Sequence, residues 1–176
     1  MSGAFHATKD GKVILVSKIQ RVSKSQYYLE IAKSVSARST CMRRQYGAVI
    51  VKNDEIVATG YNGAPRGETN CCDAGACYRQ RMGIPHGEQY EKCVAVHAEQ
   101  NAIISASRNE MLGATLYLYG YDRMAQEELR GEPCLMCRRM IKNAGIEKVI
   151  NVSGEISLPI DAEMTHNEFL KENCCE

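Results

Sequence analysis

Apolar and polar positions along the chain alternate with periods that predict both helices and strands. An apolar face with helical spacing predicts a helix over residues 23–37, with Ser23 as its N-cap. The residues of this face are Tyr28, Ile31, Ala32 and Val35. Two β-prone runs at 48–51 and 55–59 predict strands, and the Asn-Asp pair at 53–54 is typical of a hairpin turn between them.

The remaining periodic segments continue this alternation. Further helices are predicted at 97–108, 133–144 and 161–171. Further strands are predicted at 115–119 and 148–153. Pro133 suits the first position of its helix and Gly145 suits the residue after its end. Strands that alternate with helices predict an α/β fold, a mixed sheet with helices on both faces in three α/β/α layers. We expect one domain over 21–176, preceded by an N-terminal arm at 1–20 with at most one strand.

Two polar segments interrupt the pattern. Residues 61–96 are rich in Gly, Cys and polar side chains. A structureless loop of that length is uncommon inside a compact domain, so we expect it to be functional, stapled by a metal, or partly helical. Residues 120–132 are also polar, and there we expect a helical turn lying over a site.

Composition and charge favour a small-molecule substrate. The 176 residues include 22 Lys and Arg against 21 Asp and Glu, a net charge of +1. Polynucleotide binding needs clustered positive charge, which this balance does not indicate. No apolar run approaches the roughly 18 residues of a membrane span, and no export signal is recognised. We expect a cytoplasmic protein without nucleic-acid or membrane partners, whose nine cysteines are free thiols or metal ligands.

The strongest chemical signal comes from two short motifs, His97-Ala98-Glu99 and Pro133-Cys134-Leu135-Met136-Cys137. Together they match the H-x-E…P-C-x-x-C signature of zinc deaminases. His97, Cys134 and Cys137 would be three zinc ligands, which leaves a fourth position open for water, as in catalytic sites. Zinc lowers the pKa of such a water from 15.7 to about 7. Glu99 would not bind the metal; it would carry protons from the water to the ring nitrogen and the leaving ammonia.

The spacing places these residues at helix N-termini. His97 would lie in the first turn of its helix, and Cys134 and Cys137 one turn apart on one face of theirs. The two helix dipoles would favour thiolate and hydroxide over the protonated forms. The alternative is a buried histidine and two core cysteines that never meet, and the joint occurrence of the two motifs argues against it.

Several longer motifs carry a resemblance that extends from about residue 25 to residue 153. They are Gly47-Ala48-Val49-Ile50, Gly60-Tyr61-Asn62-Gly63-Ala64-Pro65-Arg66-Gly67, Asn70-Cys71-Cys72-Asp73, His97-Ala98-Glu99-Gln100-Asn101-Ala102-Ile103 and the Pro133–Cys137 motif. The chain resembles the cytidine deaminase superfamily and, through its Gly-rich loop and Asn-Cys-Cys-Asp, the deoxycytidylate (dCMP) deaminases. The resemblance implies a five-stranded sheet with helices on both faces, a homohexamer, and hydrolysis of dCMP to dUMP, the precursor for thymidylate. Many members are activated by dCTP with Mg²⁺ and inhibited by dTTP.

Beyond the three zinc ligands and Glu99, the resemblance implies a substrate-binding set of Asn62, Ala98 and Arg108. Asn62 would hydrogen-bond the sugar and phosphate end of the nucleotide, and the Arg108 guanidinium would hold the 5′-phosphate as a fork. The alternative for Asn62 is a turn residue at positive φ, and for Arg108 a solvated residue at a helix C-terminus. The effector-binding residues expected in the Gly-rich loop are Tyr61, Gly63 and Arg66.

The resemblance also implies a second, structural zinc, which some family members hold near the substrate loop. Its expected ligands are Cys41, Cys71, His86 and Cys93, with Cys72 and Cys77 as substitutes. Four ligands would close the coordination shell and staple the 61–96 segment. The alternative is a group of reduced thiols packed as small hydrophobic side chains.

Two departures from the family leave the substrate open. The 120–132 segment is longer than expected, and Glu132 stands where a smaller or uncharged residue is expected. Competing enzyme functions are deamination of dCTP, CMP or deoxycytidine, or of adenosine in tRNA, although a tRNA editor would need a basic surface. A third hypothesis is a non-catalytic nucleotide-binding module, against which Glu99 argues because a binder needs no proton carrier. Arg108, as the expected phosphate ligand, favours a monophosphate over a nucleoside.

Overall fold

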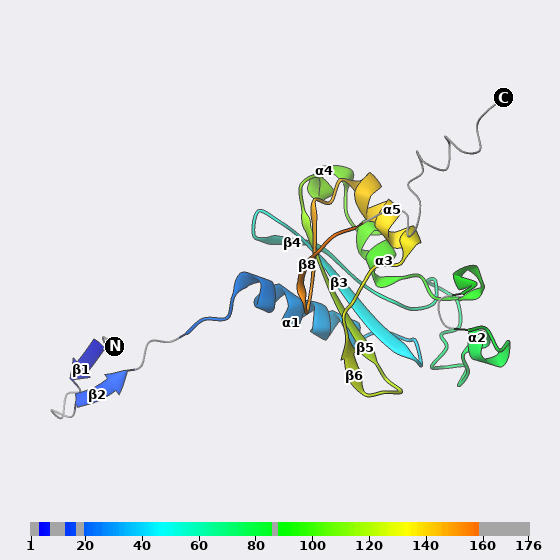
Figure 1. Cartoon of the computed structure of the whole chain (residues 1–176), viewed down its shortest axis with the longest axis horizontal. Helices are drawn as coiled ribbons and strands as arrows, with labels where there is room; N and C mark the ends of the chain where they lie inside the picture. The colour runs from blue at the N-terminus through cyan, green and yellow to red at the C-terminus, as the bar shows by residue number, and fades with distance from the viewer. Residues whose placement is uncertain (1–3, 8–12, 17–19, 86–87, 159–176) are drawn as a thin grey trace.

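The computed structural model describes residues 4–7, 13–16, 20–85 and 88–158 (Figure 1). Near the N-terminus, β1 (Ala4–Ala7) and β2 (Val13–Val16) pair antiparallel, one strand more than the sequence indicated for this arm. The helix predicted at 161–171 lies outside the described residues. No helix within the described ranges is long and apolar enough to cross a membrane.

The main sheet is mixed, as predicted. Its strands lie in the order β4-β3-β5-β7-β8, and β6 pairs with β5 outside this path. The bounds are β3 Arg44–Lys52, β4 Glu55–Tyr61, β5 Thr115–Asp122, β6 Glu127–Leu129, β7 Lys148–Asn151 and β8 Gly154–Ile156. β5 and β7 pair in parallel, and the other neighbours pair antiparallel. The described sheet has one strand more than the five that the resemblance implied, because β6 folds back beside β5.

Period-two alternation in β3 and β5 gives the sheet two apolar faces. Helix α1 (Lys24–Ser36) covers one face, and α3 (Ala98–Ile104) and α5 (Leu135–Ala144) cover the other (Figure 1). The buried residues on the α1 side are Tyr28, Ala32, Val49, Val51, Tyr117 and Tyr119. Those on the α3 and α5 side include Ala48, Ile50, Ala98, Ala102, Leu116, Leu118 and Ile141. The prediction of helices on both faces is therefore confirmed.

Two glycines allow helices to lie directly on the strand backbones. A Cβ at Gly47 in β3 would stand 2.0 Å from the carbonyl oxygen of Ala32 in α1. A Cβ at Gly60 in β4 would stand 2.3 Å from the carbonyl oxygen of Ala98 and from the amide nitrogen of Ala102, both in α3. Gly60 thus decides how closely α3 approaches the sheet.

Local capping and turn signals in the sequence correctly predicted several boundaries of helices and strands. Ser23 Oγ accepts a hydrogen bond from the Gln26 amide at 3.1 Å, which confirms the start of α1. The pair Asn53 and Asp54 has φ values of 51° and 68°, as a type I′ hairpin turn requires. Gly145 ends α5 with φ 83°.

Two details differ from the predictions. Cys134 is the N-cap of α5, so Pro133 precedes the cap instead of taking the first helical position. The single helix predicted at 97–108 is wrong: α3 ends at Ile104, and a separate helix α4 (Arg108–Met111) follows. The break has a local cause, because Ser107 caps α4 and its amide donates to the Glu110 carboxylate at 2.9 Å.

The structure agrees with one alternative predicted for the first polar segment and disagrees with the prediction for the second. Residues 61–96 are partly helical, as one of the alternatives proposed, with α2 (Tyr78–Arg81) and a 3₁₀ turn at Tyr90–Lys92. The helical turn expected within 120–132 is wrong. Asp122 instead ends β5, its Oδ1 accepts from the amides of Met124 (2.9 Å) and Ala125 (3.1 Å), and the chain returns as β6.

Candidate active site

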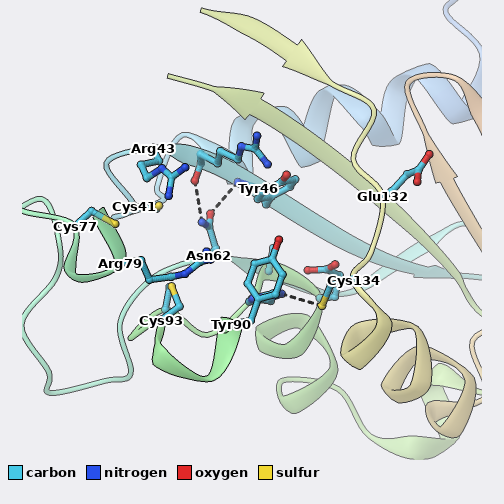
Figure 2. Close-up of a pocket in the computed structure, with 15 residues that line it drawn as sticks. Cys41, Arg43, Tyr46, Asn62, Cys77, Arg79, Tyr90, Cys93, Glu132 and Cys134 are labelled. Carbon is cyan, nitrogen blue, oxygen red and sulfur yellow. Dashed lines mark hydrogen bonds between the residues drawn. The ribbon is translucent and has the colours of Figure 1, made fainter. Parts of the chain in front are cut away.

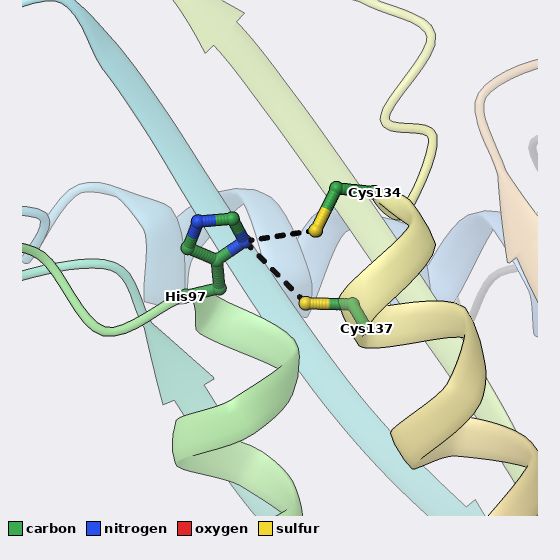
Figure 3. Close-up of side chains that lie close together, drawn as sticks. All are labelled: His97, Cys134 and Cys137. Atoms are coloured by element: carbon green, nitrogen blue, oxygen red, sulfur yellow. Dashed lines mark hydrogen bonds between the residues drawn. The ribbon is translucent and has the colours of Figure 1, made fainter. Parts of the chain in front are cut away.

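Three metal-ligand side chains meet where α3 and α5 begin (Figure 3). His97 is the N-cap of α3, and its own amide donates to the Gln100 side chain at 2.9 Å, which fixes the entry of the chain into the helix. Cys134 is the N-cap of α5, and Cys137 follows within its first turn. His97 Nδ1 lies 3.5 Å from Cys134 Sγ and 3.4 Å from Cys137 Sγ. Two helix starts that are 37 residues apart in sequence thus present one nitrogen and two sulfur atoms to a common point.

The donor set fits zinc. Zinc–nitrogen bonds of about 2.0–2.1 Å and zinc–sulfur bonds of about 2.3 Å at tetrahedral angles would place nitrogen and sulfur about 3.5 Å apart. Both observed nitrogen–sulfur distances agree with this value. Within the described residues, this is the group of three or more His, Cys, Asp or Glu side chains whose ligand atoms all lie within 4.8 Å of one another.

Charge at this cluster favours a thiolate. A hydrogen bond from the Cys137 thiol, aided by His97, lowers the pKa of Cys134 to about 4. The hydrogen bond to Cys134 in turn raises the pKa of His97. The pKa of Cys137 is raised by its bond to Cys134 and by burial. A metal ion that binds here therefore displaces the proton that the cluster shares.

Glu99 lies in the first turn of α3 beside the cluster. Its side chain is buried, with the residue only 5% exposed, and burial raises the pKa of its carboxyl group. Burial of this kind stabilises the neutral form of a carboxyl group and so favours its holding a proton. The burial and the raised pKa are compatible with the proton-carrier role expected for Glu99, which stays a prediction.

A pocket of about 140 Å³ leads away from the cluster (Figure 2). His97, Ala98, Glu99 and Cys134 line it at the metal-ligand side. Its other lining residues are Cys41, Arg43, Arg44, Tyr46, Asn62, Cys77, Arg79, Tyr90, Cys93, Ala95 and Glu132. The carboxyl groups of this lining are Glu99 and Glu132, whereas the guanidinium groups come from β3, the turn before it, and α2. The acidic and the basic side chains of the pocket therefore come from different elements.

The comparisons with known proteins agree with this geometry. Residues 22–153 match the family model described as the cytidine and deoxycytidylate deaminase zinc-binding region. The chain belongs to this deaminase family. This is the membership that the motifs around His97 and Cys134 indicated.

Individual relatives share about three tenths to two fifths of the aligned residues. The deoxycytidylate deaminase of Mycobacterium phage D29 is 39% identical over 130 residues, which cover 71% of this chain and 91% of the phage protein. The deoxycytidylate deaminase of Schizosaccharomyces pombe is 38% identical over 130 residues, 74% of this chain, but the match spans only 37% of the yeast protein. The crystal structure of dCMP deaminase from the cyanophage S-TIM5 in apo form matches with a TM-score of 0.50 and 31% identity, over 72% of this chain and 79% of that chain.

Asn62 holds a fixed position in the pocket wall. Its Oδ1 accepts from the Tyr46 amide at 2.8 Å, and its Nδ2 donates to the Arg44 carbonyl at 2.9 Å. The residue is 7% exposed. One amide hydrogen and one carbonyl lone pair remain for a ligand, so a substrate role stays a prediction that this geometry permits.

Arg108 does not lie in the pocket. It begins α4, at the far end of α3 from His97, and is exposed, with Nη1 donating to the Asn143 carbonyl at 3.0 Å. The break after Ile104 turns the chain away, so the side chain never reaches the site within this chain. Within the described residues of this chain, the geometry therefore gives no support to the expected role of Arg108 as a phosphate ligand.

Four cysteines gather near the arginine-rich part of the pocket. Cys41, Cys77 and Cys93 line it, and the pKa of Cys71 is raised by burial and then by the nearby Cys41, Cys77 and Cys93. Cys77, one of the two substitutes, thus lies with three of the expected ligands, and His86 lies outside the described residues. No three of these sulfur atoms lie within 4.8 Å of one another in the described part of the chain.

The residues expected to bind effectors lie outside the pocket lining. Tyr61 and Arg66 are exposed. Gly63 pairs through its backbone with Val96, at 3.2 and 2.8 Å. Their effector role stays a prediction from the resemblance.

Sequence reasoning missed six pocket residues: Arg43, Arg44, Tyr46, Arg79, Tyr90 and Ala95. The two adjacent arginines where β3 begins were the weak sequence signal that could have pointed to Arg43 and Arg44. No periodic pattern pointed to Arg79 or Tyr90, because they lie in the irregular 61–96 segment.

Proposed function

We propose that the protein hydrolyses dCMP to dUMP and ammonia. The observation that carries the proposal is the meeting of His97 Nδ1 with the Cys134 and Cys137 sulfur atoms beside buried Glu99, in a pocket lined by arginines. Family membership and relatives named deoxycytidylate deaminase support it.

His97, Cys134 and Cys137 would hold a catalytic Zn²⁺. When bound, the ion would make a water molecule acidic enough to act as hydroxide at neutral pH. The helix N-termini that carry these ligands stabilise the thiolate charge.

Glu99 would move the protons. Water oxygen forms a bond to C4 of the cytosine ring and the bond from C4 to the exocyclic nitrogen breaks. Of the two water protons, Glu99 delivers one to ring N3 and the other to the leaving amine, which departs as ammonia. The burial of Glu99 keeps its carboxyl group away from competing water and raises its pKa toward the range this exchange needs.

A nucleoside monophosphate fits the charge of the pocket. The anionic phosphate would point to the guanidinium groups and the base to the metal ligands. The net charge of +1 gives no support for an RNA substrate. Ala98 and Asn62 would complete the substrate contacts. The product dUMP would feed thymidylate synthesis.

A second, structural Zn²⁺ would be held by Cys41, Cys71 and Cys93, with Cys77 or His86 as the fourth ligand. The proximity of the four thiols supports it. Such an ion would staple the 61–96 segment that forms one pocket wall.

The remaining properties rest on the resemblance. We propose a cytoplasmic homohexamer, activated by dCTP with Mg²⁺ and inhibited by dTTP, with Tyr61, Gly63 and Arg66 at the effector site. We also propose one deaminase domain over 21–176 and an N-terminal arm at 1–20.

The test is loss of ultraviolet absorbance when purified protein is added to dCMP, deoxycytidine, CMP and dCTP in parallel. We expect fast turnover of dCMP. The matched control is Glu99→Gln, which should keep its zinc but lose roughly 10²–10⁴-fold in turnover, the contribution of proton transfer. Turnover of another compound in place of dCMP would show that the substrate differs from dCMP, while the proposed zinc site and its chemistry would stand. Undiminished turnover by Glu99→Gln would refute the mechanism.

A further inference from the structure

Arg79 is a buried cation whose charge has no partner of opposite sign among the described residues. The residue is 6% exposed. Its Nη2 donates to the carbonyl oxygens of Pro85, at 2.8 Å, and Glu88. Its Nε is buried without a hydrogen-bond acceptor, and no described carboxylate forms an ion pair with it. Buried charges are normally paired, so this environment favours the binding of an anion.

The guanidinium lies at the right place for a part of the substrate. Arg79 lines the pocket beside Asn62 and Tyr90 (Figure 2). Its Cζ lies 4.8 Å from the centroid of the Tyr90 ring, and that ring makes an edge contact with His97 at 5.9 Å. One aromatic ring thus separates the guanidinium from the metal-ligand imidazole, as one sugar ring separates the phosphate of a nucleotide from its base.

The other guanidinium groups are less suited to this task. Arg44 already forms an ion pair with Asp122, with Nε 3.2 Å from Oδ2. Arg108 lies outside the pocket. Arg43 lines the pocket but is only partly buried. Arg79 combines burial, a fixed orientation through two carbonyl acceptors, and an unused donor.

We propose that Arg79 binds the 5′-phosphate of the substrate and selects a nucleotide over a nucleoside. The proposal rests on the proposed deamination of dCMP. A phosphate oxygen would supply the acceptor that Nε–H lacks and the negative charge that the buried guanidinium lacks. The backbone acceptors of Pro85 and Glu88 hold the fork in place before the nucleotide arrives.

The experiment compares Arg79→Gln with Arg81→Gln, an exposed arginine on the same helix α2. We expect Arg79→Gln to raise KM for dCMP by about 10–100-fold, the effect of losing hydrogen bonds to a charged group. KM and kcat for deoxycytidine should stay within roughly twofold, because the nucleoside has no phosphate to lose. Arg79→Lys should restore part of the dCMP affinity, and Arg81→Gln should change neither substrate.

Other outcomes would overturn the proposal in distinct ways. Equal losses on dCMP and deoxycytidine would show that Arg79 only supports the loop through Pro85 and Glu88. Equal losses of activity on both substrates, together with one zinc ion fewer per chain, would show that Arg79 instead stabilises a metal site at the neighbouring Cys77 and Cys93. Wild-type protein that deaminates deoxycytidine but not dCMP would instead refute the proposed function.

A measurement on the wild-type protein keeps the proposal testable if the variants do not fold. The Nε–H resonance of Arg79 in a ¹⁵N-labelled sample should shift on addition of dUMP and stay in place with deoxyuridine. Equal shifts with both compounds, or none with either, would refute phosphate binding.

Discussion

Replacement of Gly60 by alanine should damage the metal site through the fold. The new Cβ would stand 2.3 Å from backbone atoms of α3, which no side-chain rotation can relieve. To restore ordinary contact, the helix would have to move by about 1 Å away from β4. Overpacking of this kind costs about 1–3 kcal/mol of unfolding free energy. A displacement of about 1 Å at a catalytic group can lower turnover by about 10²-fold.

Gly47→Ala is the matched control. Its Cβ would meet α1 at 2.0 Å, on the face of the sheet opposite to α3. We expect both variants to unfold at lower urea concentration by similar amounts. Only Gly60→Ala should also weaken zinc retention against a chelator and lower kcat per folded molecule, because α3 carries His97 and Glu99.

Two results would refute this reasoning. Wild-type stability of Gly60→Ala would show that α3 does not lie on the β4 backbone as described. A loss of stability with unchanged zinc retention and turnover would show that the depth of α3 on the sheet does not set the ligand geometry.

Three further predictions concern other parts of the site. Cys71→Ser should lower the zinc content by one ion per chain in atomic absorption, whereas Cys72→Ser, at an exposed thiol, should leave it unchanged; equal contents would refute the second zinc. Asn62→Ala should lower the unfolding free energy by about 1–3 kcal/mol, because the Tyr46 amide and Arg44 carbonyl lose their partners, and unchanged urea midpoints would contradict this. Hydrogen bonds from Ala125 and Met124 and the Arg44 ion pair lower the pKa of Asp122. Its stabilisation is therefore complete above the unfolded pKa near 3.9 and is lost as pH falls through the lower folded pKa. The stability difference between wild type and Asp122→Ala should accordingly shrink in acid, and a constant difference would refute the role of the charge.

The chemistry of the catalytic cluster could be predicted from sequence because it depends on local spacing. A proline before Cys134, and Cys137 three residues later, identify a helix start with two thiols on one face. His97 and Glu99 are likewise fixed relative to each other by one helical turn. Capping signals of the same local kind predicted the start of α1 and the turn at 53–54, and the Ser107 and Glu110 pair contained the signal for the end of α3.

What only the tertiary structure decided is which side chains reach the pocket from a distance. Arg108 is eleven residues from His97, and a three-residue break between α3 and α4 turned it away. Arg79 reaches the pocket through an irregular segment whose path depends on carbonyl acceptors at Pro85 and Glu88, and no periodicity encodes that path. Sequence by itself therefore determined the reacting groups, since these follow from backbone geometry over one helical turn. Which arginine side chains line the pocket was decided by tertiary packing, because packing brings together segments that share no local sequence pattern.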